Sequence, residues 1–132
     1  MSAKDDILTQ IRDCRSGDSI AVCDMLARLC PPQPDVSSIS VTCRPGNYSA
    51  AVIARAVEDC DAHLLNLNVT ADRTPDGDLV IDLRVNRANP DTVARSLARY
   101  GYDAIDAHGH MSPEMETLAR DRMNELIHYL EI

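Results

Sequence analysis

Tryptophan and phenylalanine are absent from the 132 residues, so a hydrophobic core must be built from leucine, isoleucine, valine, alanine and methionine. No apolar run approaches the roughly 18–20 residues that a membrane-spanning helix needs. Lys4, Asp5 and Asp6 place charge where a signal peptide would carry its apolar region. We therefore expect a cytoplasmic protein without a membrane partner.

Basic residues are also scarce. Lysine and arginine number 13 against 21 acidic residues, which gives a formal net charge of −8. Phosphate groups are bound by clusters of basic side chains, and no stretch here supplies one. The composition therefore argues against a nucleic-acid partner and against an anionic membrane surface.

The cysteines do not form a metal or disulfide pattern. Their number is odd, and no two are separated by only two residues. All five fall on apolar faces of predicted elements, which favours structural thiols over disulfides or zinc ligands. The five positions are Cys14, Cys23, Cys30, Cys43 and Cys60.

The most informative stretch runs from Val36 to Val69. Ile39, Val41 and Cys43 alternate with polar residues, which predicts a strand over 36–43 that ends at the Pro45-Gly46 break. Ser49 is a suitable N-cap for a helix over 50–60. A half-buried strand follows over 63–69, with Leu65, Leu67 and Val69 on its apolar side.

The pattern then repeats in a second half. Residues 74–77, Thr-Pro-Asp-Gly, predict a hairpin turn, and alternation over 79–85 predicts a third strand. Pro90 starts a helix over 90–100 with Val93, Leu97 and Tyr100 facing inward, and residues 102–107 form a last strand. This order predicts an α+β fold of the ferredoxin-like βαββαβ type, with strand order 4-1-3-2 and both helices on one face.

One face of this sheet is predicted to be solvated. Polar side chains occupy the second side of every strand, and we expect Asn66, Asn68, Asp82 and Arg84 to be exposed or to meet a polar interface.

Three amphipathic helices lie outside this unit, over about 4–15, 19–30 and 113–131. Pro31, Pro32 and Pro34 make a stiff spacer after the second of them. We therefore expect an N-terminal helical extension and spacer over 1–34, a central domain over 35–110 and a C-terminal helix over 111–132.

Residues 36–107 resemble an ACT-like domain, whose signature is a strand, a Pro-Gly turn, a helix and a second strand. They are most similar to the ACT-like C-terminal region of bacterial proteins that begin with a CBS pair. The similarity is carried by Ile-Ala-Arg-Ala-Val-Glu at 53–58, by Arg-Tyr-Gly-Tyr at 99–102 and by the terminal helix at 122–132. Residues 1–30 are too short for a CBS pair, so nucleotide binding by such a pair is not implied.

The turn is the candidate ligand site. Free N–H groups at a helix N-terminus and the helix dipole favour an anion, and Arg44 adds positive charge beside Gly46, Asn47 and Tyr48. Glycine at 46 allows a positive φ or a close approach by a ligand. A simple tight turn is the alternative. ACT sequences usually carry an aspartate at or before this turn, where this chain has Cys43 and Arg44.

His63 stands at the start of the second strand, where the ACT resemblance implies a ligand contact from the neighbouring chain. An exposed edge residue is the simpler interpretation. His108, Gly109 and His110 suggest a metal site but lack a third ligand, so we interpret them as a solvated loop. His63 lies at the same end of the sheet, but three strand spacings, about 14 Å, separate the two edge strands.

No catalytic pattern is present, and we predict neither an enzyme nor a cofactor. The leading hypothesis is a regulatory ACT-like homodimer that senses an amino acid or another small anion at the Pro45-Gly46 turn. The alternative is a protein–protein interaction module without a ligand. We expect the chains to pair through an apolar patch on the last helix, because that patch is too large to stay exposed. It consists of Leu118, Met123, Leu126, Ile127 and Leu130.

Overall fold

The computed structural model describes Thr9, residues 19–110 and residues 113–130, with side chains over 19–109 and 120–130. The chain divides after Gln33 into two units, Met1–Gln33 and Pro34–Ile132. The predicted domain boundary was placed after residue 34. The helix predicted over 4–15 lies outside the described residues, except for Thr9.

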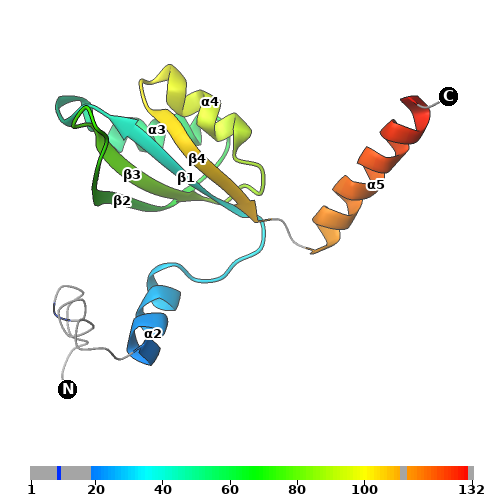
Figure 1. The fold of residues 1–132 in the computed structure, drawn as a ribbon, viewed down its shortest axis with the longest axis horizontal. Helices are drawn as coiled ribbons and strands as arrows, with labels where there is room; N and C mark the ends of the chain where they lie inside the picture. Colours follow the sequence, from blue (N-terminus) through cyan, green and yellow to red (C-terminus); the bar gives the residue numbers. More distant parts are fainter. Residues whose placement is uncertain (1–8, 10–18, 111–112, 131–132) are drawn as a thin grey trace. The chain divides into compact units, whose positions relative to one another are not determined.

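The second unit contains one antiparallel sheet with the order β2-β3-β1-β4 (Figure 1). Read from the other edge, this order is 4-1-3-2. The strands are β1 (Val36–Cys43), β2 (Leu64–Arg73), β3 (Leu79–Val85) and β4 (Asp103–His110). The predicted hairpin turn joins β2 to β3: Gly77 has φ 84°, and its N–H donates to the carbonyl of Thr74 at 2.8 Å.

Two helices cover the same face of this sheet (Figure 1). They are α3 (Ala50–Glu58) and α4 (Asp91–Arg99), each slightly shorter than predicted. Ser49 caps α3 as predicted, because its hydroxyl accepts the N–H of Val52 at 3.2 Å. Both helices bury residues at helical spacing, so each contributes one apolar side to the core.

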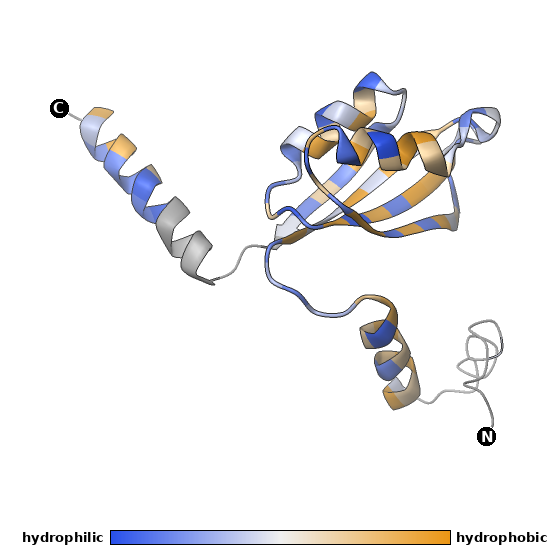
Figure 2. Cartoon of the chain, turned by 180° about the vertical axis from the view of Figure 1, so that it is seen from behind, coloured by the Kyte–Doolittle hydropathy of each residue, from blue (hydrophilic) through white to orange (hydrophobic). Residues whose placement is uncertain are grey.

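The core lies between the helices and the two central strands. In β1 and β3 every second residue is buried, and Figure 2 shows the corresponding alternation of hydrophobic and hydrophilic residues. Each fully buried aliphatic side chain contributes about 1.5–3 kcal/mol to folding. The Ser96 hydroxyl, also fully buried, donates to the Ala56 carbonyl at 2.6 Å and ties the helices together. The largest buried apolar side chains are Ile39, Val41, Ile53, Val57, Ile81, Val85, Val93 and Leu97.

The opposite face of the sheet is polar, as predicted. None of Asn66, Asn68, Asp82 and Arg84 is buried. Three of them form hydrogen bonds across strands: Arg84 donates to Asn66 Oδ1 at 2.7 Å, and Asp82 accepts the hydroxyl of Ser40 on β1 at 2.7 Å. The predicted solvated face is therefore confirmed.

Three register shifts occur in the edge strands: two in β2, between Leu64 and Asn66 and between Val69 and Arg73, and one in β4. In β2, Leu64 pairs with Val85 and Asn66 with Arg84, which leaves Leu65 as an extra residue. Leu65 is consequently exposed, and Leu64 packs against the core in its place. The prediction that Leu65 faces inward was wrong, because a bulge shifts the alternation by one residue. Val69, predicted on the same apolar side, is also exposed, by 44%. In β4, Ile105 is the extra residue and is 57% exposed.

The His108-Gly109-His110 segment is part of β4 and pairs with the start of β1, so the predicted loop was wrong. Its glycine has a packing role. A Cβ atom at Gly109 would lie 2.0 Å from the carbonyl oxygen of Ala88. This close backbone approach, which no local pattern indicates, requires a residue without a side chain at position 109.

The terminal helices are α2 (Ser19–Leu29) and α5 (Pro113–Leu130). Both lie where the apolar periodicity predicted them. Of the cysteines expected on apolar faces, Cys43 is buried and Cys60 is half-buried, whereas Cys23 and Cys30, on and just after α2, are exposed. Cys14 lies outside the described residues.

The glycines provide a matched stability test. Gly109→Ala should lower the free energy of unfolding by about 1–3 kcal/mol, because the added methyl group overlaps the Ala88 carbonyl. Gly46→Ala is the control, since a Cβ there meets no atom within 4 Å, and it should change stability by less than about 0.5 kcal/mol. Urea denaturation measures both values. Equal stability of the two variants would contradict the close approach at Gly109.

Candidate functional site

The candidate ligand turn is a short, exposed segment between β1 and α3. After Cys43, Arg44 adopts an extended conformation, and Pro45–Asn47 forms a single 3-10 turn, η1. The N–H of Asn47 donates to the Arg44 carbonyl at 2.9 Å, which closes this turn. Arg44 to Asn47 are exposed and Tyr48 is half-buried. The turn therefore presents four consecutive residues to solvent.

Gly46 does not have the backbone role expected of it. Its φ is not among the positive values in the described chain, and its surroundings are open. Neither a positive φ nor a close approach within the chain explains the glycine. What remains at this position is free space on the outer side of the turn, which leaves room for a ligand.

The inner side of the turn is filled by Tyr102. This side chain is only 2% exposed, and its hydroxyl donates to the carbonyl of Asn47 at 2.8 Å. Burial raises the pKa of the Tyr102 phenol. Tyr102 thus holds the turn against the core from a residue 55 positions away in the chain. The sequence signal was the Arg-Tyr-Gly-Tyr motif, in which no packing role had been predicted for Tyr102.

The preceding tyrosine has a different role from the predicted one. Tyr100 was expected to face inward, but it is 38% exposed and its hydroxyl donates to the Asp59 carboxylate just after α3. That hydrogen bond raises the pKa of Tyr100. Gly101 has φ 92°, and this left-handed turn ends α4 and directs Tyr102 inward. The motif therefore connects the end of α4 to both ends of α3.

The start of α3 has the electrostatic character expected of an anion site. The Ser49 hydroxyl accepts one N–H of the first turn, from Val52, and the dipole of α3 leaves partial positive charge there. The exposed side chain of Arg44 adds a full positive charge directly before η1. This arrangement can attract a carboxylate or a similar small anion.

His63 lies at the other end of the sheet. Its N–H donates to Asn86 Oδ1 at 2.6 Å, and its carbonyl accepts the N–H of Asn86 at 3.2 Å. Leu64 pairs with Val85, and Val85 pairs with Ser37 on its other side. Ser37 lies six residues before Cys43 on β1. At about 3.3 Å per residue, His63 is about 20 Å from the turn along the sheet. The structure brings Arg44, Gly46, Asn47 and Tyr48 together, and does not bring His63 to them within one chain.

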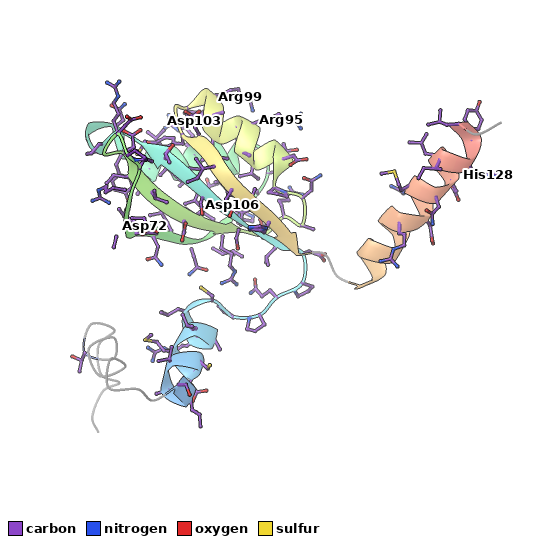
Figure 3. All side chains as sticks on the ribbon, in the orientation of Figure 1. Asp72, Arg95, Arg99, Asp103, Asp106 and His128 are labelled. Atoms are coloured by element: carbon purple, nitrogen blue, oxygen red, sulfur yellow. The ribbon has the colours of Figure 1, made fainter. Side chains whose placement is uncertain are left out.

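The predicted interface residues form a stripe on the described half of α5. Met123, Leu126, Ile127 and Leu130 recur at intervals of three and four residues, which places them on one side of the helix. Their exposed fractions are 57%, 54%, 47% and 73%. His128, labelled on α5 in Figure 3, belongs to the opposite side. The side chain of Leu118 lies outside the described residues.

Metal chemistry finds no support in the parts of the chain that the structure describes. No three His, Cys, Asp or Glu side chains there are grouped for a metal ion. His108 instead contacts Asp106, labelled on β4 in Figure 3, with 3.0 Å between Nε2 and Oδ1. Over residues 19–110 and 113–130, none of the helices has both the length and the apolar character needed to cross a membrane.

Comparison of the chain with protein-family models, with curated proteins and with solved structures gives no match.

Removal of the Tyr102 hydroxyl should weaken the support of the turn. We expect Tyr102→Phe to lower the free energy of unfolding by about 0.5–1.5 kcal/mol, the usual net value of one hydrogen bond. Tyr129→Phe, at a position 76% exposed on α5, is the control and should leave stability unchanged. Urea denaturation at neutral pH gives both values. A Tyr102→Phe variant as stable as wild type would contradict the anchoring role.

Wild type and Tyr102→Phe should also differ in how their stability changes in alkaline solution. The folded pKa of Tyr102 lies above the unfolded value of about 10, so the folded state retains a proton that the unfolded state loses. Stability from this group is complete below pH 10 and is lost as the pH rises further. Wild type should therefore lose its advantage over Tyr102→Phe above pH 10, as measured by urea denaturation between pH 8 and 11. A constant difference would contradict the raised pKa.

Proposed function

We propose that this chain is a non-catalytic assembly module with an ACT-like, ferredoxin-like domain, and that it acts as a homodimer paired through α5. The exposed stripe of Met123, Leu126, Ile127 and Leu130 carries this proposal. An apolar surface of this kind, continuous along one helix face, is typical of an interaction site.

The central domain offers no matching surface for this stripe. Its helix-facing side is filled by the core, and its other side presents Ser40, Asp82 and Arg84. Its exposed large apolar residues occur singly, such as Leu65 on β2 and Ile105 on β4. A second copy of α5 carries a stripe of the same size and chemistry, and a two-fold axis lets each copy cover the other.

Sedimentation equilibrium tests the homodimer. At 10–100 µM we expect the mass of two wild-type chains. Leu126→Asp should give single chains, because a buried carboxylate at the centre of the stripe is costly. His128→Asp introduces an acidic side chain on the opposite side of α5 and should remain dimeric.

The central domain should unfold at the same temperature in all three proteins, which separates loss of pairing from loss of folding. A wild-type monomer at 100 µM, or a Leu126→Asp dimer, would overturn pairing through α5.

A second function is favoured by the turn itself. The turn has positive charge from Arg44 and from the N-terminus of α3, and open space beside Gly46. Its backbone is held by the hydrogen bond from Tyr102 to Asn47. We propose that this turn binds a small carboxylate, such as a free amino acid. Because His63 is about 20 Å away within its own chain, it reaches the turn only from a partner in the dimer.

A thermal-shift screen of amino acids and dicarboxylates tests this binding. A ligand at 100 times its dissociation constant adds about 2.7 kcal/mol of stability. Arg44→Ala should abolish the shift, whereas Arg95→Ala, which removes an equal charge from the exposed side of α4, should retain it. His63→Ala should reduce the shift in the dimer and have no effect in a Leu126→Asp background. An equal response in Arg44→Ala and wild type would exclude the turn as the binding site.

A further inference from the structure

A proline-rich segment joins α2 to β1, and the proposed function does not use it. Its sequence is Pro-Pro-Gln-Pro over 31–34, and all four residues are exposed. They belong to neither a helix nor a strand (Figure 1). The segment is therefore an accessible stretch of chain outside the regular structure.

The conformation of this segment is set by its prolines. The pyrrolidine ring fixes φ at about −65° at positions 31, 32 and 34. A proline also disfavours the helical region at the residue before it, which favours extended ψ values at Cys30, Pro31 and Gln33. Consecutive residues with these angles form a polyproline II helix. Asp35, whose φ is 58°, then turns the chain into β1 and ends the run.

A polyproline II helix places Pro31 and Pro34 on one edge. It has about three residues per turn and rises about 3.1 Å per residue, so residues three apart are aligned and about 9 Å apart. Pro32 lies on a different edge. Two prolines at this spacing are the PxxP pattern, which docks along grooves lined by aromatic side chains.

Docking of this segment has a low entropic cost. The prolines already hold the chain in the extended conformation that such a groove accepts, so few backbone angles must be ordered on binding. The exposed proline rings provide the apolar contact area.

Charge gives the segment a direction. Arg28, in the last turn of α2, is exposed and lies three residues before Pro31. Asp35 follows Pro34 directly. The segment therefore has a positive start and a negative end. A carboxylate at one end of a groove would pair with the Arg28 guanidinium in one docking direction only.

From this spacing and charge we infer that residues 28–34 are a docking segment for an SH3-type domain of another protein. The aromatic groove of that domain holds Pro31 and Pro34, and its carboxylates pair with Arg28. This partner is not the second copy of the chain proposed at α5, so the inference does not depend on the homodimer. A spacer without a partner is the other outcome of the experiment.

The experiment is titration of the full-length chain into a panel of isotope-labelled SH3 domains with carboxylates beside the groove, followed by NMR. We expect chemical-shift changes in the groove of at least one domain that saturate below about 1 mM. Pro31→Ala and Pro34→Ala should each weaken this binding by about tenfold or more, because each removes a ring from the docked edge. Pro32→Ala, the same chemical change on another edge, is the matched control and should change the affinity by less than about threefold.

A charge reversal tests the direction of docking. Arg28→Glu should weaken the binding by about tenfold or more, because it places a carboxylate against carboxylates. Arg95→Glu makes the same change on the exposed side of α4 and should have no effect.

The outcomes separate this inference from the homodimer. Leu126→Asp should bind the SH3 domain as tightly as wild type, even where it no longer pairs through α5. No saturation with any domain of the panel up to about 1 mM would overturn the inference. Equal losses in the three proline variants would overturn the PxxP register, and equal affinities of Arg28→Glu and Arg95→Glu would overturn the pairing of Arg28.

Discussion

The burial of one face of β1 and β3 against α3 and α4 is the constraint on which the remaining structure depends. Ile39 and Val41 on β1 meet Ile53 and Leu97 on the helices in a single cluster without exposed members. Because side chains alternate along a strand, this burial commits the other face of the sheet to polar residues. It also fixes where β1 ends, and therefore where the exposed Arg44 begins the turn into α3.

Hydrogen bonds from α4 make the position of α3 more specific than apolar contact alone. Ser96 contacts the middle of α3 through Ala56, Tyr100 contacts its end through Asp59, and Tyr102 contacts the turn before it through Asn47. Buried polar groups that are fully paired restrict the packing to one arrangement. The candidate turn is therefore a surface segment whose backbone is set by the core, as is common for binding loops on a rigid scaffold.

Local periodicity was sufficient for the central strands and insufficient at the edges. The alternation of Ile39, Val41 and Cys43 predicted β1 with its observed bounds, because this strand is paired on both sides and one face is buried. The edge strands contain bulges at Leu65 and Ile105 that depend on pairing with distant residues. Likewise, a glycine is required at position 109 because the carbonyl of Ala88 lies against it. The turn before α3 is supported by a hydrogen bond from Tyr102, far along the chain. A sequence pattern within one segment cannot indicate contacts of this range.

The two terminal helices differ in what would hold a partner. The pairing proposed through α5 would be governed by protein concentration and the hydrophobic effect, because the stripe there offers only apolar side chains. The described residues of α2 expose two large apolar side chains, Ile20 and Leu26, so burial of this helix would contribute less to association than burial of the stripe on α5.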